Sequence, residues 1–350
     1  MQRHKVITVT GAFIIILCSG GIWLTHSADV ERRTRGTFTV TREAVTIMSA
    51  PIPVLTPHTH EVSDTRIDTV NSPGHGVNVN SGTFIIPFDM WVTDITTIVD
   101  NAPTSVIHHI VLFRQDRMDP ICPNRHEQLM VVGADTATEL NLPKPYGFFL
   151  KKGTRIYLRN MAHNPDAPRG SGETYRNVSL GLKLTYERAS QSDRTQPVAL
   201  YRIFIDDHPE YCSGPLTDLS LITDSFTVPP SSFSYVRSTP SGNRGATGRF
   251  IFPTSGTLVY IGAHTHPADG GGTVRLQLNS KVIGSFTPQH IGPEAWTWRT
   301  PNARTDIAIS KGDVMTVQSE YNNPHPLPVP GAMGMGVFVF APQNPDSLLK

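Results

Sequence analysis

The chain is short of charge and of cysteine for its length. Charged residues make up 17% of the 350 residues and the formal net charge is +1, whereas an average soluble protein has about 25% charged residues. There is no long basic or acidic run, so the sequence has no electrostatic field to hold nucleic acid, and no segment resembles a nucleic-acid-binding motif. Nucleic acid is therefore excluded as an expected partner.

Long amphipathic helical patterns are also missing. The sequence instead has 28 glycines and 29 prolines, and short apolar runs alternate with turn residues. Leu180, Leu182 and Leu184 alternate with other residues at the period of two that a half-buried strand requires. The sequence predicts an all-β protein made of two tandem antiparallel β-sandwich domains. Strands are expected in residues 83–88, 106–113, 155–161, 179–187, 198–205, 249–252, 257–263, 273–278, 313–320 and 336–340.

The chain divides into four predicted segments. Residues 1–28 contain Arg3 and Lys5 ahead of an apolar stretch, which is typical of a signal peptide or an uncleaved signal anchor. We therefore expect export, and any membrane attachment would be through this N-terminal segment only. Residues 29–65 have several prolines and no sustained periodicity, which predicts a linker or arm. Two domains follow, at 66–195 and 196–345, and within the second we expect a long surface loop at 229–248 and a tight hairpin turn at 269–272.

Cysteine is scarce, at three residues in the whole chain. Cys18 lies inside the apolar N-terminal stretch, which leaves Cys122 and Cys212 in the exported part. Two cysteines in an oxidising compartment are expected to pair. This hypothesis tethers the first domain to the segment that enters the second.

Histidines carry the clearest chemical signal. His264 and His266 stand two apart in a predicted strand, so both side chains project from one face and could converge on one metal ion. His108 and His109 are adjacent and would point to opposite faces of an ideal strand, so joint ligation requires a bulge or a strong local twist. His163 stands alone before a predicted turn. Taken motif by motif, ordinary surface or core histidines explain these patterns better than ligands do.

Two methionines stand near the C-terminal end of the second domain. Met333 and Met335 lie in the segment Gly-Ala-Met-Gly-Met-Gly, and a methionine in a strand is more often core filler than ligand. A thioether beside two imidazoles, however, favours the soft Cu(I) state. The methionines therefore become candidate copper ligands only when they are considered together with the histidines.

The order and neighbourhoods of these residues resemble the ascorbate-dependent type II copper monooxygenases, which include peptidylglycine alpha-hydroxylating and dopamine beta-monooxygenases. The segments that carry the resemblance are 105–113, 158–163 and 260–266 together with the methionine segment, and the match spans roughly residues 65 to 345. The resemblance implies two jelly-roll-like sandwiches with one copper in each. It assigns His108, His109 and His163 to one copper and His264, His266 and Met333 to the other, with Met335 as the fallback thioether.

The resemblance also implies a reaction. The copper held by His264, His266 and Met333 would be the catalytic one, which activates dioxygen and hydroxylates a C–H bond of a small-molecule substrate. The copper of the three histidines would store the second electron, and ascorbate or a similar reductant would supply electrons. The family's carboxylate-anchoring positions correspond to Gly262, Met335 and Val337 here, whose side chains cannot bind a carboxylate. Glycine-extended peptides are therefore not the expected substrate.

Two other functions stay open at the level of the sequence. One is a copper-binding or copper-handling protein that keeps both sites without hydroxylation. The other is a β-sandwich surface-binding module in which most of the 14 histidines are incidental.

Overall fold

The computed structural model describes residues 36–55, 77–119, 126–133, 139–162, 164, 173–205, 226–238, 249–266, 272–287, 289–290, 298–299, 303–324 and 326–346. Within these ranges, no helix combines the length and the hydropathy needed to cross a bilayer. The apolar N-terminal stretch predicted as a signal peptide or anchor lies outside them.

Most of the described residues are in strands, which confirms the predicted all-β class. Short apolar runs of the sequence form long strands, because side chains at alternate positions pack into a core on one face. The strands of the first half are β1 Thr37–Val40, β2 Ala44–Met48, β3 Ile52–Leu55, β4 Val77–Ile85, β5 Met90–Asp100, β6 Ile107–Met118, β7 His126–Gly133, β8 Glu139–Asn141, β9 Tyr146–Leu150, β10 Arg155–Ala162, β11 Tyr175–Arg188 and β12 Gln196–Pro197, with 3-10 turns η1 Thr104–Val106 and η2 Ala189–Gln191.

The second half continues with strands of similar length. They are β13 Ala199–Phe204, β14 Phe226–Val228, β15 Ser232–Ser238, β16 Arg249–Ile251, β17 Gly256–His266, β18 Gly272–Leu278, β19 Lys281–Phe286, β20 Gln289–His290, β21 Trp298–Arg299, β22 Ala303–Ile309, β23 Val314–Asn323 and β24 Val329–Pro342.

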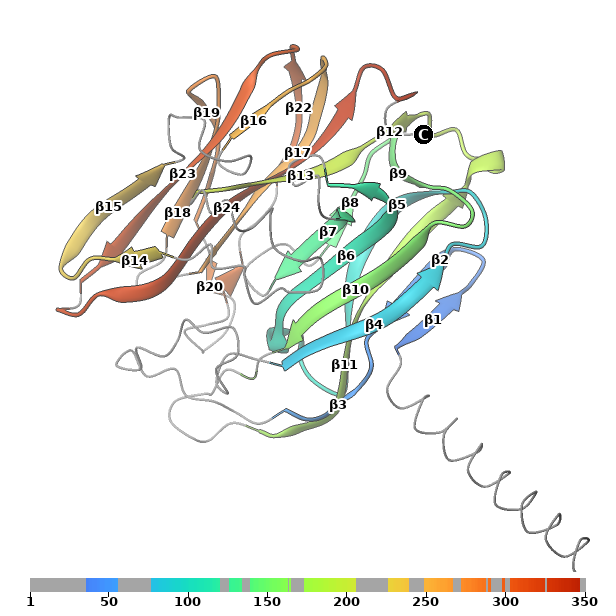
Figure 1. The fold of residues 1–350 in the computed structure, drawn as a ribbon, viewed down its shortest axis with the longest axis horizontal. Coiled ribbons are helices and arrows are strands. Elements are labelled where there is room, and N and C mark those ends of the chain that lie inside the picture. Colours follow the sequence, from blue (N-terminus) through green and yellow to red (C-terminus); the bar gives the residue numbers. More distant parts are fainter. Residues whose placement is uncertain are drawn as a thin grey trace, which may run out of the picture.

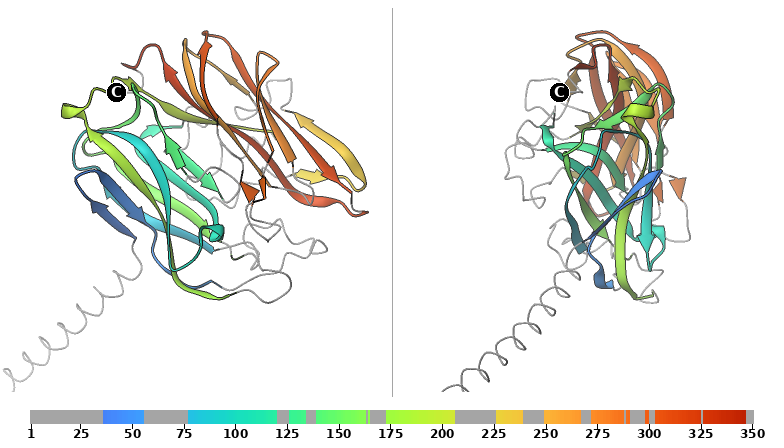
Figure 2. Two further views of the ribbon diagram at one scale, coloured as in Figure 1. Left: turned by 180° about the vertical axis from the view of Figure 1, so that it is seen from behind. Right: turned by 90° about the vertical axis from the view of Figure 1, so that its right-hand side faces the viewer.

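The strands form two sandwiches that lie side by side (Figures 1 and 2). In the first sandwich, an eight-stranded sheet of order β1-β2-β11-β5-β9-β12, with β3 on β11 and β8 on β5, faces a four-stranded sheet of order β4-β10-β6-β7. In the second, the sheets have the orders β13-β24-β17-β22, with β14 on β24, and β15-β23-β18-β19, with β16 on β23. Pairing between main strands is antiparallel, apart from the short β12–β9 pair.

The predicted arm at 29–65 is wrong over residues 37–55. This segment forms β1, β2 and β3, and both β2 and β3 pair with β11. Val45 and Ile47 are fully buried in the core of the first sandwich, so the segment is an integral part of the sheet. The prolines that suggested a linker are tolerated because Pro51 precedes β3, and because Pro53 has no cross-strand partner in the register of β3 with β11.

The surface loop predicted at 229–248 is wrong over residues 232–238. These residues form β15, which pairs with β23 at the far end of the sequence. Residues 269–271 of the predicted hairpin turn lie outside the described residues. The strands on either side, β17 and β18, belong to different sheets of the sandwich.

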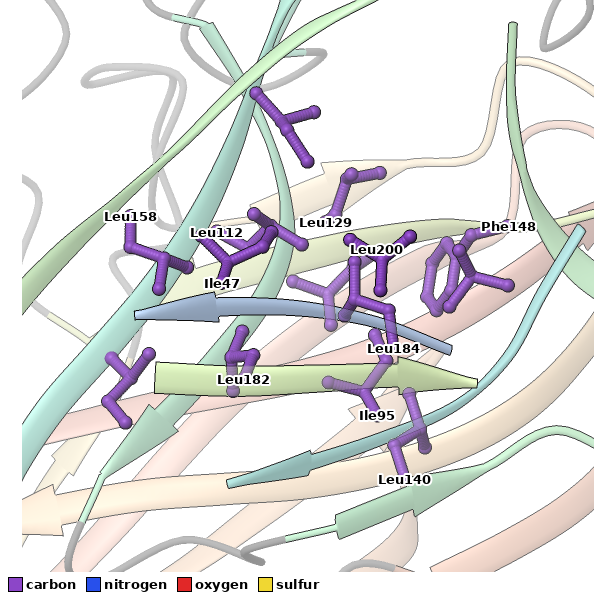
Figure 3. Close-up of a cluster of buried hydrophobic side chains, with 14 of the residues drawn as sticks. Ile47, Ile95, Leu112, Leu129, Leu140, Phe148, Leu158, Leu182, Leu184 and Leu200 are labelled. Carbon is purple, nitrogen blue, oxygen red and sulfur yellow. The ribbon is translucent and has the colours of Figure 1, made fainter. Parts of the chain in front are cut away.

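The first core extends across the boundary between the sandwiches. Ile47, Leu182 and Leu184 meet Leu112 and Leu158 between the two sheets of the first sandwich (Figure 3). The same cluster includes residues of the second sandwich, from β13, β17 and β24. One face of the sheet β13-β24-β17-β22 therefore packs against the first sandwich; we call it the interface face, and its buried apolar residues are Leu200, Val259, Val339 and Ala341.

The role of β2 in the core can be tested by truncation. Ile47→Ala is expected to lower the free energy of unfolding by about 2–5 kcal/mol, since it leaves a cavity in a packed core. Val54→Ala is the matched control: Val54 is 42% exposed, so its truncation should cost less than about 1 kcal/mol. Urea denaturation followed by tryptophan fluorescence measures both. Equal, small effects would mean that 37–55 is an arm after all.

Candidate functional site at the domain interface

Alternate side chains of β17 lie in two environments, the core of the second sandwich and the interface face. Ile261 and Ala263 point into the core of the second sandwich, and Thr265 points the same way, with its Oγ1 3.3 Å from the buried Tyr321 hydroxyl. His264, between Ala263 and Thr265, therefore belongs to the interface face. It is buried there, with 1% of its surface exposed.

Strand β24 brings the methionines beside this histidine motif. The register pairs His264 with Met335 and His266 with Met333. Cross-strand partners in an antiparallel pair lie on the same face of the sheet, with Cβ atoms about 4.5–5.5 Å apart. The backbone thus places Met333 directly opposite His266, although the two segments are far apart in the sequence.

Strand β6 contains the irregularity that the adjacent histidines require. Met161 of β10 pairs with His109, whereas Ala162 pairs with Ile107, so the register skips His108. Two residues of β6 thus oppose one step of β10, which is the definition of a β-bulge. The strict alternation that would separate His108 and His109 is broken at this position.

The two histidine motifs meet at the interface. Nε2 of His109 lies 3.2 Å from Nε2 of His264, across 155 positions of the chain. The ring centroids are 4.9 Å apart and the ring planes are inclined by 51°. One histidine of each predicted copper set is therefore in direct contact with the other set.

The other predicted site residues lie outside the described residues or are described by their backbone only. His163 lies outside the described residues, as do Cys122 and Cys212 of the expected disulfide. For His108, His266 and Met333 the structure describes the backbone only. Among the described residues, no group of three or more His, Cys, Asp and Glu side chains is arranged to hold a metal ion.

A buried charged cluster next to this interface was not predicted. The Glu127 carboxylate lies 3.2 Å from Nε of Arg117 and 3.7 Å from Nε of Arg114. Burial raises the pKa of Glu127 more than the two guanidinium groups lower it. Burial also raises the pKa of Tyr201 in the second sandwich, and the Glu127 charge adds to the effect. The charge of Glu127 therefore affects the pKa of a residue in the other sandwich.

An ion pair joins the two sandwiches directly. Arg202 of β13 donates to Oδ2 of Asp119 at 3.2 Å, and both side chains are less than 10% exposed. The partners are 83 positions apart, so no local pattern in the sequence could have revealed the pair. It fixes the second sandwich against the segment that follows β6.

The positions that correspond to the family's carboxylate anchors lie on β17 and β24. Gly262 is the cross-strand partner of Val337, and Met335 is buried. Arg202 is the partner of Val337 on its other side, but its guanidinium is bound by Asp119. The surroundings of His264 on this sheet are therefore apolar.

No protein-family model and no curated protein matches the chain. Among solved structures, the chain is similar to the major capsid protein P2 of bacteriophage PM2, with a TM-score of 0.34, 6% identity and coverage of 86% of this chain and 99% of that one. It is also similar to a peptide-N(4)-(N-acetyl-beta-D-glucosaminyl) asparagine amidase, with a TM-score of 0.40, 9% identity and coverage of 86% and 97%. A third is PNGF-II, with a TM-score of 0.32, 11% identity and coverage of 85% and 65%.

The interdomain ion pair gives a stability test. Arg202→Ala is expected to lower the free energy of unfolding by about 3–5 kcal/mol, because it leaves the Asp119 carboxylate buried without this partner. The double variant Arg202→Met with Asp119→Leu removes both charges and should recover most of the loss. Guanidinium denaturation of the single and double variants measures the difference. A double variant no more stable than Arg202→Ala would contradict the pairing.

Proposed function

We propose that the chain is a copper- and dioxygen-dependent monooxygenase that hydroxylates a C–H bond of a weakly polar substrate, with ascorbate or a similar small molecule as reductant. The observation that supports this proposal most is the contact between His109 and His264. Two motifs that the family resemblance assigns to copper lie far apart in the sequence and converge at one place between two sandwiches.

The donor set at this place suits copper. Nε2 atoms of two histidines face each other, and the register puts a thioether-bearing residue, Met333, opposite His266. Imidazole and thioether are ligands that copper accepts, and the thioether favours Cu(I). The resemblance assigns His264, His266 and Met333 to one copper and His108, His109 and His163 to the other, and the contact joins one histidine of each set. Copper bound there would supply dioxygen activation and would relay to it the electrons of the reductant.

His264 has an apolar, water-poor environment on its own sheet. His264 is almost completely buried, and the neighbouring positions on its sheet are Gly262, Met335 and Val337. Arg202, the cation on the adjacent strand, is bound by Asp119. A substrate that presents a free carboxylate finds no donor among these residues, which is why we propose a less polar substrate.

The proposal places the protein outside the cytoplasm. The N-terminal apolar stretch supports export, and export supports pairing of Cys122 with Cys212. Both statements rest on the sequence.

Oxygen uptake tests the activity. The full chain, loaded with copper, is expected to consume dioxygen in the presence of ascorbate, and a panel of weakly polar substrates should stimulate the uptake. His264→Ala should lower the stimulated rate more than about 100-fold, since even substitutions that only support metal ligands cost about 10–100-fold. An oxygen electrode measures the rate, and mass spectrometry detects the hydroxylated product.

His126→Ala is the matched control for this experiment. His126 is also on a strand of the first sandwich, where its Nδ1 lies 3.1 Å from the Tyr157 hydroxyl. It is seven positions along β7 from Gly133, the partner of His109, which is roughly 20 Å of strand. Its rate should equal that of the wild type. Stoichiometric copper without any stimulated uptake would instead indicate copper handling, and absence of copper binding would favour a surface-binding module.

X-ray absorption at the copper K edge tests the methionine. We expect Met333→Ile to remove the sulfur scattering shell of the Cu(I) protein, because the thioether is the sulfur ligand in the proposed site. Met335→Ile, at the buried position two residues later, should leave the shell intact. The reverse pattern would make Met335 the ligand, and a shell present in both variants would remove methionine ligation at either position alone.

A further inference from the structure

The contact at the interface has a geometry that fits one metal ion. Two nitrogens bound to a tetrahedral ion at about 2.0–2.1 Å lie roughly 3.3–3.4 Å apart. The Nε2 atoms of His109 and His264 are 3.2 Å apart. A linear two-coordinate ion would instead need about 4 Å between the same atoms. The observed spacing therefore matches two corners of a tetrahedral site.

We propose that His109 and His264 ligate the same ion, so that the two sandwiches share one metal centre at their interface. This inference deepens the proposed function and rests on it for the choice of copper. It departs from the family resemblance, which implies a separate copper in each sandwich. Without an ion, one ring donates its N–H to the other ring nitrogen; the ion replaces that hydrogen and is bonded to both rings.

The backbone offers further ligands near this pair from both sandwiches. His266 follows His264 by two positions on β17, with Met333 opposite it, and two residues of strand span about 7 Å. His108 adjoins His109 at the bulge of β6. The remaining ligands of the proposed four-coordinate site would come from these backbone positions. Such a site favours an ion with tetrahedral preference, which is Cu(I) for this donor set, with Zn²⁺ as the competitor.

If both histidines bind one ion, substituting either histidine weakens the binding of that same ion. This can be tested by titration. The full chain and the variants His109→Ala, His264→Ala and the double variant are titrated anaerobically with Cu(I) against a colorimetric chelator, and in parallel with Zn²⁺. Each single variant should weaken the same ion by about tenfold or more. The double variant should lose no further ion, because both single substitutions already act on one centre. His126→Ala should bind like the wild type.

Separate sites predict a different result. Each single variant would then lose a different ion, and the losses would add in the double variant; that result would overturn the shared centre. Absence of Cu(I) and Zn²⁺ binding by the wild type would overturn it too. The thermal midpoint provides a second readout: copper should raise it in the wild type and raise it less in either single variant. His109→Gln and His264→Gln, which keep side-chain volume, replace the alanine variants if these fail to fold by circular dichroism.

The two proposals fail in different ways. Copper shared between the histidines with no ascorbate-dependent oxygen uptake would refute the monooxygenase and leave the shared centre standing. Stimulated oxygen uptake with additive loss of two ions would refute the shared centre and leave the monooxygenase standing.

Discussion

The alternation of side chains along β17 and β24 is the constraint on which the site depends. These two strands are the central pair of a sheet whose inner face fills the second core and whose outer face packs on the first sandwich. A shift by one residue would exchange every side chain between the two faces. Because aromatic side chains such as Phe338 and Phe340 must stay in the second core, the register is fixed, and His264 is held on the interface face.

The interface changes character along its length. At one end Leu200, Val339 and Ala341 extend the first core onto the second sandwich. The ion pair of Arg202 with Asp119 is also buried there, and His264 meets His109 further along β17. An apolar contact is stabilising without being directional, whereas the ion pair and the imidazole contact require one alignment. The apolar part thus supplies the adhesion, and the polar parts define how the sandwiches are oriented.

Sequence patterns predicted the parts of this structure that depend on local periodicity. The leucines at 180, 182 and 184 are all fully buried, as their alternation indicated. The pairing of β2 and β3 with β11 was missed, because short runs broken by prolines carry no signal of a partner over 100 positions away. β15 was missed for the same reason. Pairing partners are a property of the whole fold, so local composition alone predicted an arm and a loop.

The candidate site was predictable in its residues and not in its arrangement. Proximity of Met333 to the His264–His266 motif could be inferred only through resemblance, and the register now supports it at the backbone level. The bulge at His108 could be stated as a requirement, since adjacent residues of a regular strand diverge. Direct contact between His109 and His264 had no basis in the sequence, because it depends on how two separately folded sandwiches pack.

The packing of the sandwiches also bears on how the two histidine motifs relate in solution. Domains joined by a small polar interface usually move relative to each other, whereas a large apolar interface suppresses such motion. Here residues of both sandwiches belong to one buried cluster, and a buried ion pair spans the same boundary. Opening the interface would expose that apolar surface and separate the charges. The contact of His109 with His264 is therefore a property of the folded chain, and the packing that holds the two sandwiches together would also keep both histidines in place around a bound ion.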